Sequence, residues 1–142
     1  MTVPLPFAEI IIGEDNPADT RLITLCLEEY DLPLTITTFH SGRALKEYLE
    51  KGHLAPGSTY VFLDFFLAEI EGPRLLQWIR KSDTIQSFPV VMMSGSYLEE
   101  VREKSYAYGG NYFLEKSTDP EQFFEELKGI LSYYFRQQTY KR

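Results

Sequence analysis

Four apolar runs in this chain end at polar side chains suited to holding a metal ion or a phosphoryl group. The runs and the residues that follow or close them are 8–13 with Glu14 and Asp15, 60–63 with Asp64, 89–93 with Ser94, and 112–115 with Lys116. If these runs are parallel strands of one sheet, their carboxyl ends meet at the edge where open α/β sheets place binding sites. Three carboxylates, one hydroxyl and one ammonium at that edge suit a metal-assisted phosphoryl transfer onto a carboxylate.

Signals for the start of helices separate these runs. They fall at Asn16–Pro17, Ser41, Pro73, Ser96–Glu99 and Asp119–Pro120. This set consists of capping side chains, prolines in a first helical turn and one capping-box spacing. A β-branched and aromatic stretch at 34–39 supplies a further strand. The strand–helix unit therefore occurs five times, which predicts an α/β fold in which helices cover both faces of a parallel sheet as a three-layer sandwich.

The length and charge of the chain narrow its class. Its 142 residues, 44% of them hydrophobic, predict a single domain over 1–142 with a frayed polar tail at 137–142. The net charge of −7 argues against a nucleic-acid partner, because such partners favour a basic face. No apolar run approaches the ~20 residues that span a bilayer, and a secretory signal is missing. We therefore expect a cytoplasmic protein without a membrane partner.

Asp15 and Asp64 are the strongest candidates for metal ligands. Glu14 and Asp15 precede a predicted helix, where acids also stabilise the helix dipole by roughly 0.3–1 kcal/mol, so this pair alone has a structural explanation. Asp64 closes an apolar strand, where a carboxylate is costly to desolvate without a partner. Because neighbouring carboxylates repel one another and magnesium prefers carboxylates, waters and phosphate oxygens, the three acids together predict Mg²⁺ as the cofactor.

Ser94 and Lys116 each have an ordinary explanation as well. The serine could simply bond to nearby backbone, and the lysine could be solvated. Together they bring a hydroxyl donor and a mobile positive charge to the same edge as the acids. Gly95, which follows the serine, leaves room for a phosphoryl group. The combination favours a phosphoryl site over two unrelated surface residues.

The ordered set of these residues resembles the receiver domain of response regulators, the phospho-acceptor half of two-component signalling, over nearly the whole chain. The matching positions are Glu14 and Asp15 as the acidic pair, Asp64 as acceptor, Gly72 after it, Ser94 as switch hydroxyl, Phe113 as switch aromatic and Lys116 as the lysine. The stretch 14–19 is also similar to single-domain regulators that partner phytochrome-type sensor kinases. The resemblance implies a flavodoxin-like sheet of order 2-1-3-4-5 with five helices.

The resemblance also implies a reaction at Asp64. A sensor histidine kinase or a phosphotransfer protein would donate a phosphoryl group to this carboxylate, with Ser94 and Lys116 as its catalytic partners. Asp15, Asp64 and the backbone carbonyl of Phe66 would hold Mg²⁺, while Glu14 would bind a coordinated water. The protein would be no enzyme in the usual sense, although it would promote its own phosphorylation and dephosphorylation.

The resemblance further implies a switch and an output surface. Ser94 would move toward the phosphoryl group and Phe113 would pack into the vacated space, which would change the surface of the fourth helix, fifth strand and fifth helix. Because no output domain follows in this sequence, we expect the signal to leave through an unknown downstream protein or a homodimer. An extra apolar stripe on the fifth helix, at Phe124, Leu131 and Phe135, favours the homodimer.

Three positions depart from the family pattern. Ala68 and Ser117 stand where prolines are common, and Phe66 is bulkier than the usual residue two after the acceptor. A cis bond before Ser117 would cost about 2.5–4 kcal/mol, and the ring of Phe66 is expected to shield Asp64 from water. Two alternatives stay open: a binding module of receiver fold that is not phosphorylated, and a small hydrolase with Asp64 as nucleophile.

Overall fold

One parallel sheet forms the centre of the molecule. The structure, a computed structural model, describes residues 8–29, 33–55, 57–95, 98–116 and 119–140, with residues 134–140 described by their backbone alone. The strands are β1 (Ala8–Gly13), β2 (Leu34–Phe39), β3 (Thr59–Asp64), β4 (Val90–Ser94) and β5 (Tyr112–Glu115). They pair in the order β2-β1-β3-β4-β5, which confirms the expected flavodoxin-like topology.

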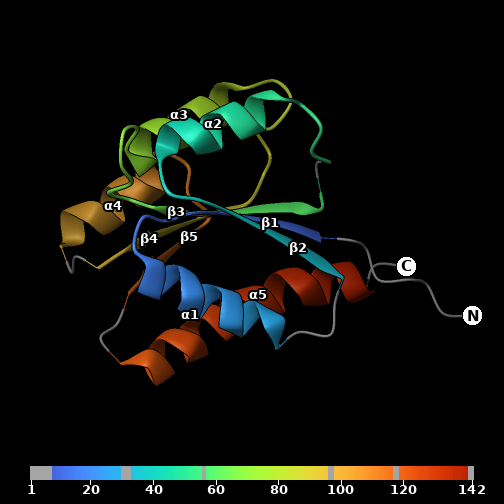
Figure 1. The fold of residues 1–142 in the computed structure, drawn as a ribbon, viewed down its shortest axis with the longest axis vertical. Helices are drawn as coiled ribbons and strands as arrows, with labels where there is room; N and C mark the ends of the chain where they lie inside the picture. The colour runs from blue at the N-terminus through green and yellow to red at the C-terminus, as the bar shows by residue number, and fades with distance from the viewer. Residues whose placement is uncertain (1–7, 30–32, 56, 96–97, 117–118, 141–142) are drawn as a thin grey trace, which may run out of the picture.

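Helices connect the strands and cover both faces of the sheet. They are α1 (Pro17–Glu28), α2 (Gly42–Glu50), α3 (Gly72–Lys81), α4 (Glu99–Ala107) and α5 (Pro120–Tyr140). Figure 1 shows α1 and α5 on one face and α2, α3 and α4 on the other, which confirms the three-layer sandwich. Asn16 caps α1 by accepting hydrogen bonds from two backbone N–H groups, and Ser41 caps α2 through one, as the sequence predicts.

Each face of the sheet carries its own hydrophobic core, and β1 contributes to both. Ile10 and Ile12 pack into the cluster beneath α1 and α5, whereas Ile11 packs into the cluster beneath α2 and α3, and all three side chains are fully buried. Successive side chains of a strand point to opposite faces, so a strand covered on both sides must be apolar at every position. This explains the continuous apolar runs in the sequence.

Arg80, near the end of α3, ties the amino edge of the sheet together. Its guanidinium donates hydrogen bonds to the carbonyls of Phe88 at 2.7 Å and Gly109 at 2.9 Å, and to the side-chain oxygen of Asn111 at 2.9 Å. That oxygen also accepts a bond of 2.7 Å from the backbone N–H of Val90. The network therefore fixes the start of β4, the start of β5 and the end of α4 to one side chain.

The fourth helix differs from its prediction. Ser96, expected to open a capping box with Glu99, lies outside the described residues, and α4 begins at Glu99 after Leu98, which provides no side-chain cap. Of the apolar side chains in and beside this helix, Val101 is buried, whereas Leu98 is 60% exposed and Tyr108 is 36% exposed. Few side chains therefore hold this helix to the sheet.

The prediction of an extra apolar stripe on the surface of α5 is wrong for Phe124 and Leu131. Leu131 is 1% exposed, and Phe124 packs partly buried against the core shared with α1. Because α5 contacts both the sheet and α1, its buried face is wider than one helical stripe. Tyr133 is 47% exposed, and the side chain of Phe135 lies outside the described ones. The backbone of α5 stays helical to Tyr140, through most of the tail expected to fray.

Among the helices that the structure describes, none combines the length and the apolar character required to cross a membrane.

Gly72 lets the first turn of α3 lie directly against the end of β3, and its replacement tests this contact. A Cβ at this position would lie 2.5 Å from the backbone oxygen of Asp64 and 3.0 Å from the Cα of Phe65. Since backbone cannot easily move aside, we expect Gly72→Ala to lower the free energy of unfolding by roughly 1–3 kcal/mol in urea denaturation.

Gly129 provides the matched control, because it lies inside α5 with open space around its Cα. Gly129→Ala should raise the free energy of unfolding by about 0.5–1 kcal/mol, since alanine has less conformational freedom to lose in a helix. A Gly72→Ala protein as stable as the wild type would contradict the close approach of α3 to β3.

Candidate functional site

The ends of four strands bring the predicted site residues to the carboxyl edge of the sheet. Glu14 follows β1 and Asp64 closes β3, and both are buried at 0% and 6% exposure. Ser94 closes β4 at 0% exposure, and Lys116 follows β5 with its side chain 12% exposed. Parallel pairing of these strands places their carboxyl ends at one edge, so residues far apart in sequence surround one point.

The three predicted carboxylates form one cluster. Single oxygen atoms of Glu14, Asp15 and Asp64 all lie within 4.8 Å of one another. Glu14 and Asp64 are buried and Asp15 is exposed, so the cluster opens to solvent on one side. Hard divalent cations take carboxylate oxygens together with waters, which an open side supplies. The acidic cluster therefore fits a divalent cation.

Lys116 provides the positive charge of this site. Its ammonium lies 2.5 Å from Oε1 of Glu14, 3.1 Å from Oδ2 of Asp19 and 3.5 Å from Oδ1 of Asp64. Its backbone N–H donates to the carbonyl of Ser94, the last residue of β4, at 2.8 Å, which continues the pairing of the two strands one residue beyond β5. The lysine is therefore held at its backbone by the sheet and at its ammonium by three acids.

Burial and charge act in opposite directions on the two central groups. The pKa of Glu14 is raised to about 7, because desolvation and the nearby charge of Asp64 outweigh the contact with Lys116 and a hydrogen bond from the backbone of Asn16. Burial alone would lower the pKa of Lys116, but its carboxylate partners raise it above the ordinary value. Lys116 therefore stays charged. The charged form of Glu14 is only partly stabilised by its surroundings, and a further cation nearby would stabilise it.

The remaining predicted residues surround this centre. An added Cβ on Gly95 would meet nothing within 4 Å, so space is open beside Ser94. The backbone N–H of Phe66 donates to Oδ1 of Asp64 at 3.4 Å, while its ring lies 4.9 Å from that of Phe65 and is 53% exposed. Phe113 does not join the acids; it packs partly buried against the core on the α3 side.

Two neighbours of the site were not predicted from the sequence. Asp19 lies in the first turn of α1, and its carboxylate contacts the ammonium of Lys116. His40 is exposed, and its Nδ1 lies 3.2 Å from the carbonyl oxygen of Glu14. Asp15 precedes the helix whereas Asp19 lies in its first turn, so helical spacing gives no signal that both acids lie at the site.

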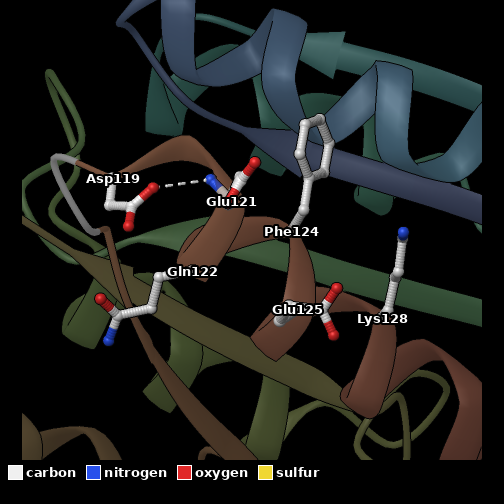
Figure 2. A pocket seen from close by; sticks show the side chains of 6 residues that line it. All are labelled: Asp119, Glu121, Gln122, Phe124, Glu125 and Lys128. Carbon is white, nitrogen blue, oxygen red and sulfur yellow. Dashed lines mark hydrogen bonds between the residues drawn. The ribbon is translucent and has the colours of Figure 1, made fainter.

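A separate cavity of about 540 Å³ runs along the first turns of α5. The residues that line it are Asp119, Glu121, Gln122, Phe124, Glu125 and Lys128. Figure 2 shows the ring of Phe124 pointing toward α1 and Asp119 accepting a hydrogen bond from the backbone N–H of Glu121, which is 3.0 Å long. Because its walls all come from residues 119–128, this cavity is distinct from the acidic site.

The fold and the acidic edge define the class of the protein, and comparison with known proteins identifies it. Residues 10–128 match the family model described as the response regulator receiver domain. The chain therefore belongs to the receiver domains of response regulators, which are signalling proteins of two-component systems, are phosphorylated on an aspartate and bind a divalent metal.

Two similar proteins from cyanobacteria extend this result. The chain is 26% identical over 133 residues to the response regulator Rcp1 of Synechocystis sp., covering 92% of this chain and 90% of that protein. It superposes on the phosphorylated cyanobacterial phytochrome response regulator RcpA with a TM-score of 0.83 and 30% identity, covering 93% of this chain and 96% of that one. The Mn²⁺-bound form of Rcp1 superposes with a TM-score of 0.81 and 25% identity, covering 90% and 94%.

The acidic cluster predicts that magnesium stabilises the folded protein. A ligand that binds only the native state raises the free energy of unfolding, by about 2.7 kcal/mol at a concentration 100 times its Kd. We therefore expect the melting temperature to rise with magnesium concentration, and Asp15→Ala to remove most of this rise because the open side of the cluster loses its carboxylate.

Asp83→Asn is the matched control, because Asp83 is an exposed acid outside the cluster. Thermal melts in EDTA and in increasing magnesium compare the three proteins. An Asp15→Ala protein that responds to magnesium like the wild type would show that the cation binds elsewhere.

Proposed function

We propose that this receiver domain accepts a phosphoryl group from a sensor histidine kinase or a phosphotransfer protein on Asp64. The observation that carries the proposal is the placement of Asp64, a nearly buried carboxylate that closes β3 inside the acidic cluster and 3.5 Å from the ammonium of Lys116. The similarity to a phosphorylated phytochrome response regulator supports the same kind of donor. A cytoplasmic location follows from such a donor.

The reaction is a transfer between two nucleophiles. An oxygen of Asp64 attacks the phosphorus atom of a phosphohistidine, so an O–P bond forms while the P–N bond breaks and its electron pair returns to the imidazole of the donor. Negative charge grows on the oxygens of the phosphoryl group during this step. The ammonium of Lys116 is the positive group of this chain that lies nearest to Asp64 among the described residues.

Magnesium is the cation we propose for the acidic cluster. Asp15, Asp64 and the backbone carbonyl of Phe66 would hold it, and Glu14 would bind one of its waters. When bound, the ion neutralises the carboxylates and the phosphoryl oxygens. The raised pKa of Glu14 and the Mn²⁺-bound form of Rcp1 support a divalent cation here. The exposed ring of Phe66 stands beside the acceptor and is proposed to limit the access of water.

The proposed signal runs from Ser94 to the surface of α4, β5 and α5. Ser94 would bond to the phosphoryl group, and Phe113, on the neighbouring strand, would repack in response. The backbone N–H of Phe113 donates to the hydroxyl of Tyr106 in α4 at 3.1 Å, so the strand that carries Phe113 is bonded directly to this helix. Few buried side chains hold α4, which makes it easy to shift.

Replacement of Asp64 tests the phosphoryl acceptor. Asp64→Asn has nearly the same shape but no anionic oxygen to attack phosphorus, so a small acyl phosphate with magnesium should label the wild type and leave this variant unlabelled. Asp83→Asn, an exposed acid elsewhere, should label like the wild type. Intact-mass measurement reads the result directly.

Stoichiometric labelling of Asp64→Asn would disprove Asp64 as the acceptor. A wild type that stays unlabelled by acyl phosphate and by any kinase would favour the alternative of a binding module that keeps the receiver fold without being phosphorylated.

We also propose that the phosphorylated protein forms a homodimer through the α4-β5-α5 face. This face carries exposed aromatic side chains, Tyr106 at 43% and Tyr133 at 47%, and the Tyr133 ring lies 6.1 Å from that of Tyr112 on β5. Aromatic side chains exposed together are typical of protein contacts. Phe124 and Leu131 do not contribute, because they are packed in the core.

Light scattering with and without beryllofluoride, a mimic of the phosphoryl group, measures this association. We expect the wild type to dimerise with the mimic and Tyr133→Glu to stay monomeric, since a charge in the contact must be desolvated. Leu25→Glu, on the exposed side of α1, should behave like the wild type. A wild type that is monomeric with the mimic well above micromolar concentration would exclude the dimer.

A further inference from the structure

Asp19 is an acid at the site that the metal cluster does not include. It lies in the first turn of α1, and its carboxylate is 3.1 Å from the ammonium of Lys116, with its side chain 22% exposed. The other two partners of this ammonium, Glu14 and Asp64, both belong to the cluster that fits a divalent cation. Asp19 is therefore the partner of Lys116 that stands outside that cluster.

We propose that Asp19 is a positioning residue, which keeps the ammonium of Lys116 at the phosphoryl site while a divalent cation occupies the acidic cluster. This inference rests on the proposed function, since it concerns the readiness of Lys116 to meet a phosphoryl group.

Lys116 has as many carboxylate partners as its ammonium has N–H donors. A lysine ammonium has three N–H donors, and here three carboxylates surround it. A divalent cation in the cluster attracts the charge of Glu14 and Asp64 and repels the ammonium a few ångströms away. The lysine side chain is flexible and strongly hydrated, so it would turn to solvent unless an independent anion held it. Asp19 is that anion.

The distances also indicate what the phosphoryl group displaces. Asp64 is the most distant of the three partners of Lys116 at 3.5 Å, and it is the proposed phosphoryl acceptor. A phosphoryl oxygen can therefore replace the Asp64 oxygen as the third acceptor, while Asp19 continues to hold the ammonium.

Both ends of the contact are fixed by the backbone. The side chain of Asn16 accepts a hydrogen bond of 3.3 Å from the backbone N–H of Asp19, which sets the first turn of α1. The backbone N–H of Lys116 is bonded to Ser94 at 2.8 Å. The contact between the two side chains therefore follows from the fold and needs no rearrangement of the chain.

Binding of beryllofluoride in saturating magnesium tests the proposal. Asp19→Asn should weaken this binding several-fold because the ammonium is released, and Asp19→Glu should restore part of the loss because it keeps the charge. Glu121→Gln removes the same charge from the first turn of α5 and should bind like the wild type. An Asp19→Asn protein that binds as tightly as the wild type would overturn the proposal.

A double-mutant cycle keeps the two hypotheses separable, because it needs no phosphoryl group. The free energies of unfolding of Asp19→Asn, Lys116→Met and the double variant are measured in urea, in EDTA and then in magnesium. We expect non-additive effects in EDTA that persist in magnesium, whereas the coupling of Glu14→Gln with Lys116→Met should fall when the cation binds.

Additive effects in EDTA, or a coupling of Asp19 with Lys116 that magnesium abolishes, would overturn the proposal. A wild type that fails to bind beryllofluoride would count against the proposed function instead, and the unfolding cycle would still decide whether Asp19 holds Lys116.

Discussion

Repulsion among three carboxylates, balanced by one ammonium, is the constraint on which the site of this protein depends. Glu14, Asp15 and Asp64 come from two strands whose ends are forced together by the parallel sheet, and Lys116 arrives from a third. Without Lys116 the buried carboxylates would have no cationic partner among the described residues, and even with it desolvation raises the pKa of Glu14 to about 7. The same unbalanced charge that is costly to fold is what attracts a metal ion.

The sheet makes this balance possible because it fixes the distance between groups that no local segment could bring together. Ser94 and Lys116 are joined by a backbone hydrogen bond, and β4 and β5 run in register up to that point. Phe113 lies on β5, the strand that ends just before Lys116. Its backbone N–H donates to the hydroxyl of Tyr106 in α4. A change at the acceptor and a change at the surface are therefore separated by one strand and one helix.

Much of this arrangement could be predicted from the sequence because it depends on local rules. Apolar runs that end in polar residues predicted the strands and their carboxyl edge, and Asn16 predicted the start of α1. The role of Asp19 could not be predicted, because the rotation of α1 about its axis decides which of its acids faces the site. The surface of α5 was predicted wrongly for a similar reason: Phe124 and Leu131 are covered by packing against α1 and the sheet, which a helical period alone does not reveal.

The hydrogen bonds of Arg80 hold the two ends of α4 unequally. The carbonyl of Gly109, just beyond the carboxyl end of the helix, is bonded to this guanidinium, while the amino end follows Leu98 without a side-chain cap. A helix of nine residues is about 13 Å long, so a rotation of about 10° around the fixed end displaces the other end by roughly 2 Å. In such a rotation the end that follows β4 and Ser94 along the chain would move farthest, and the end bonded to Arg80 would move least.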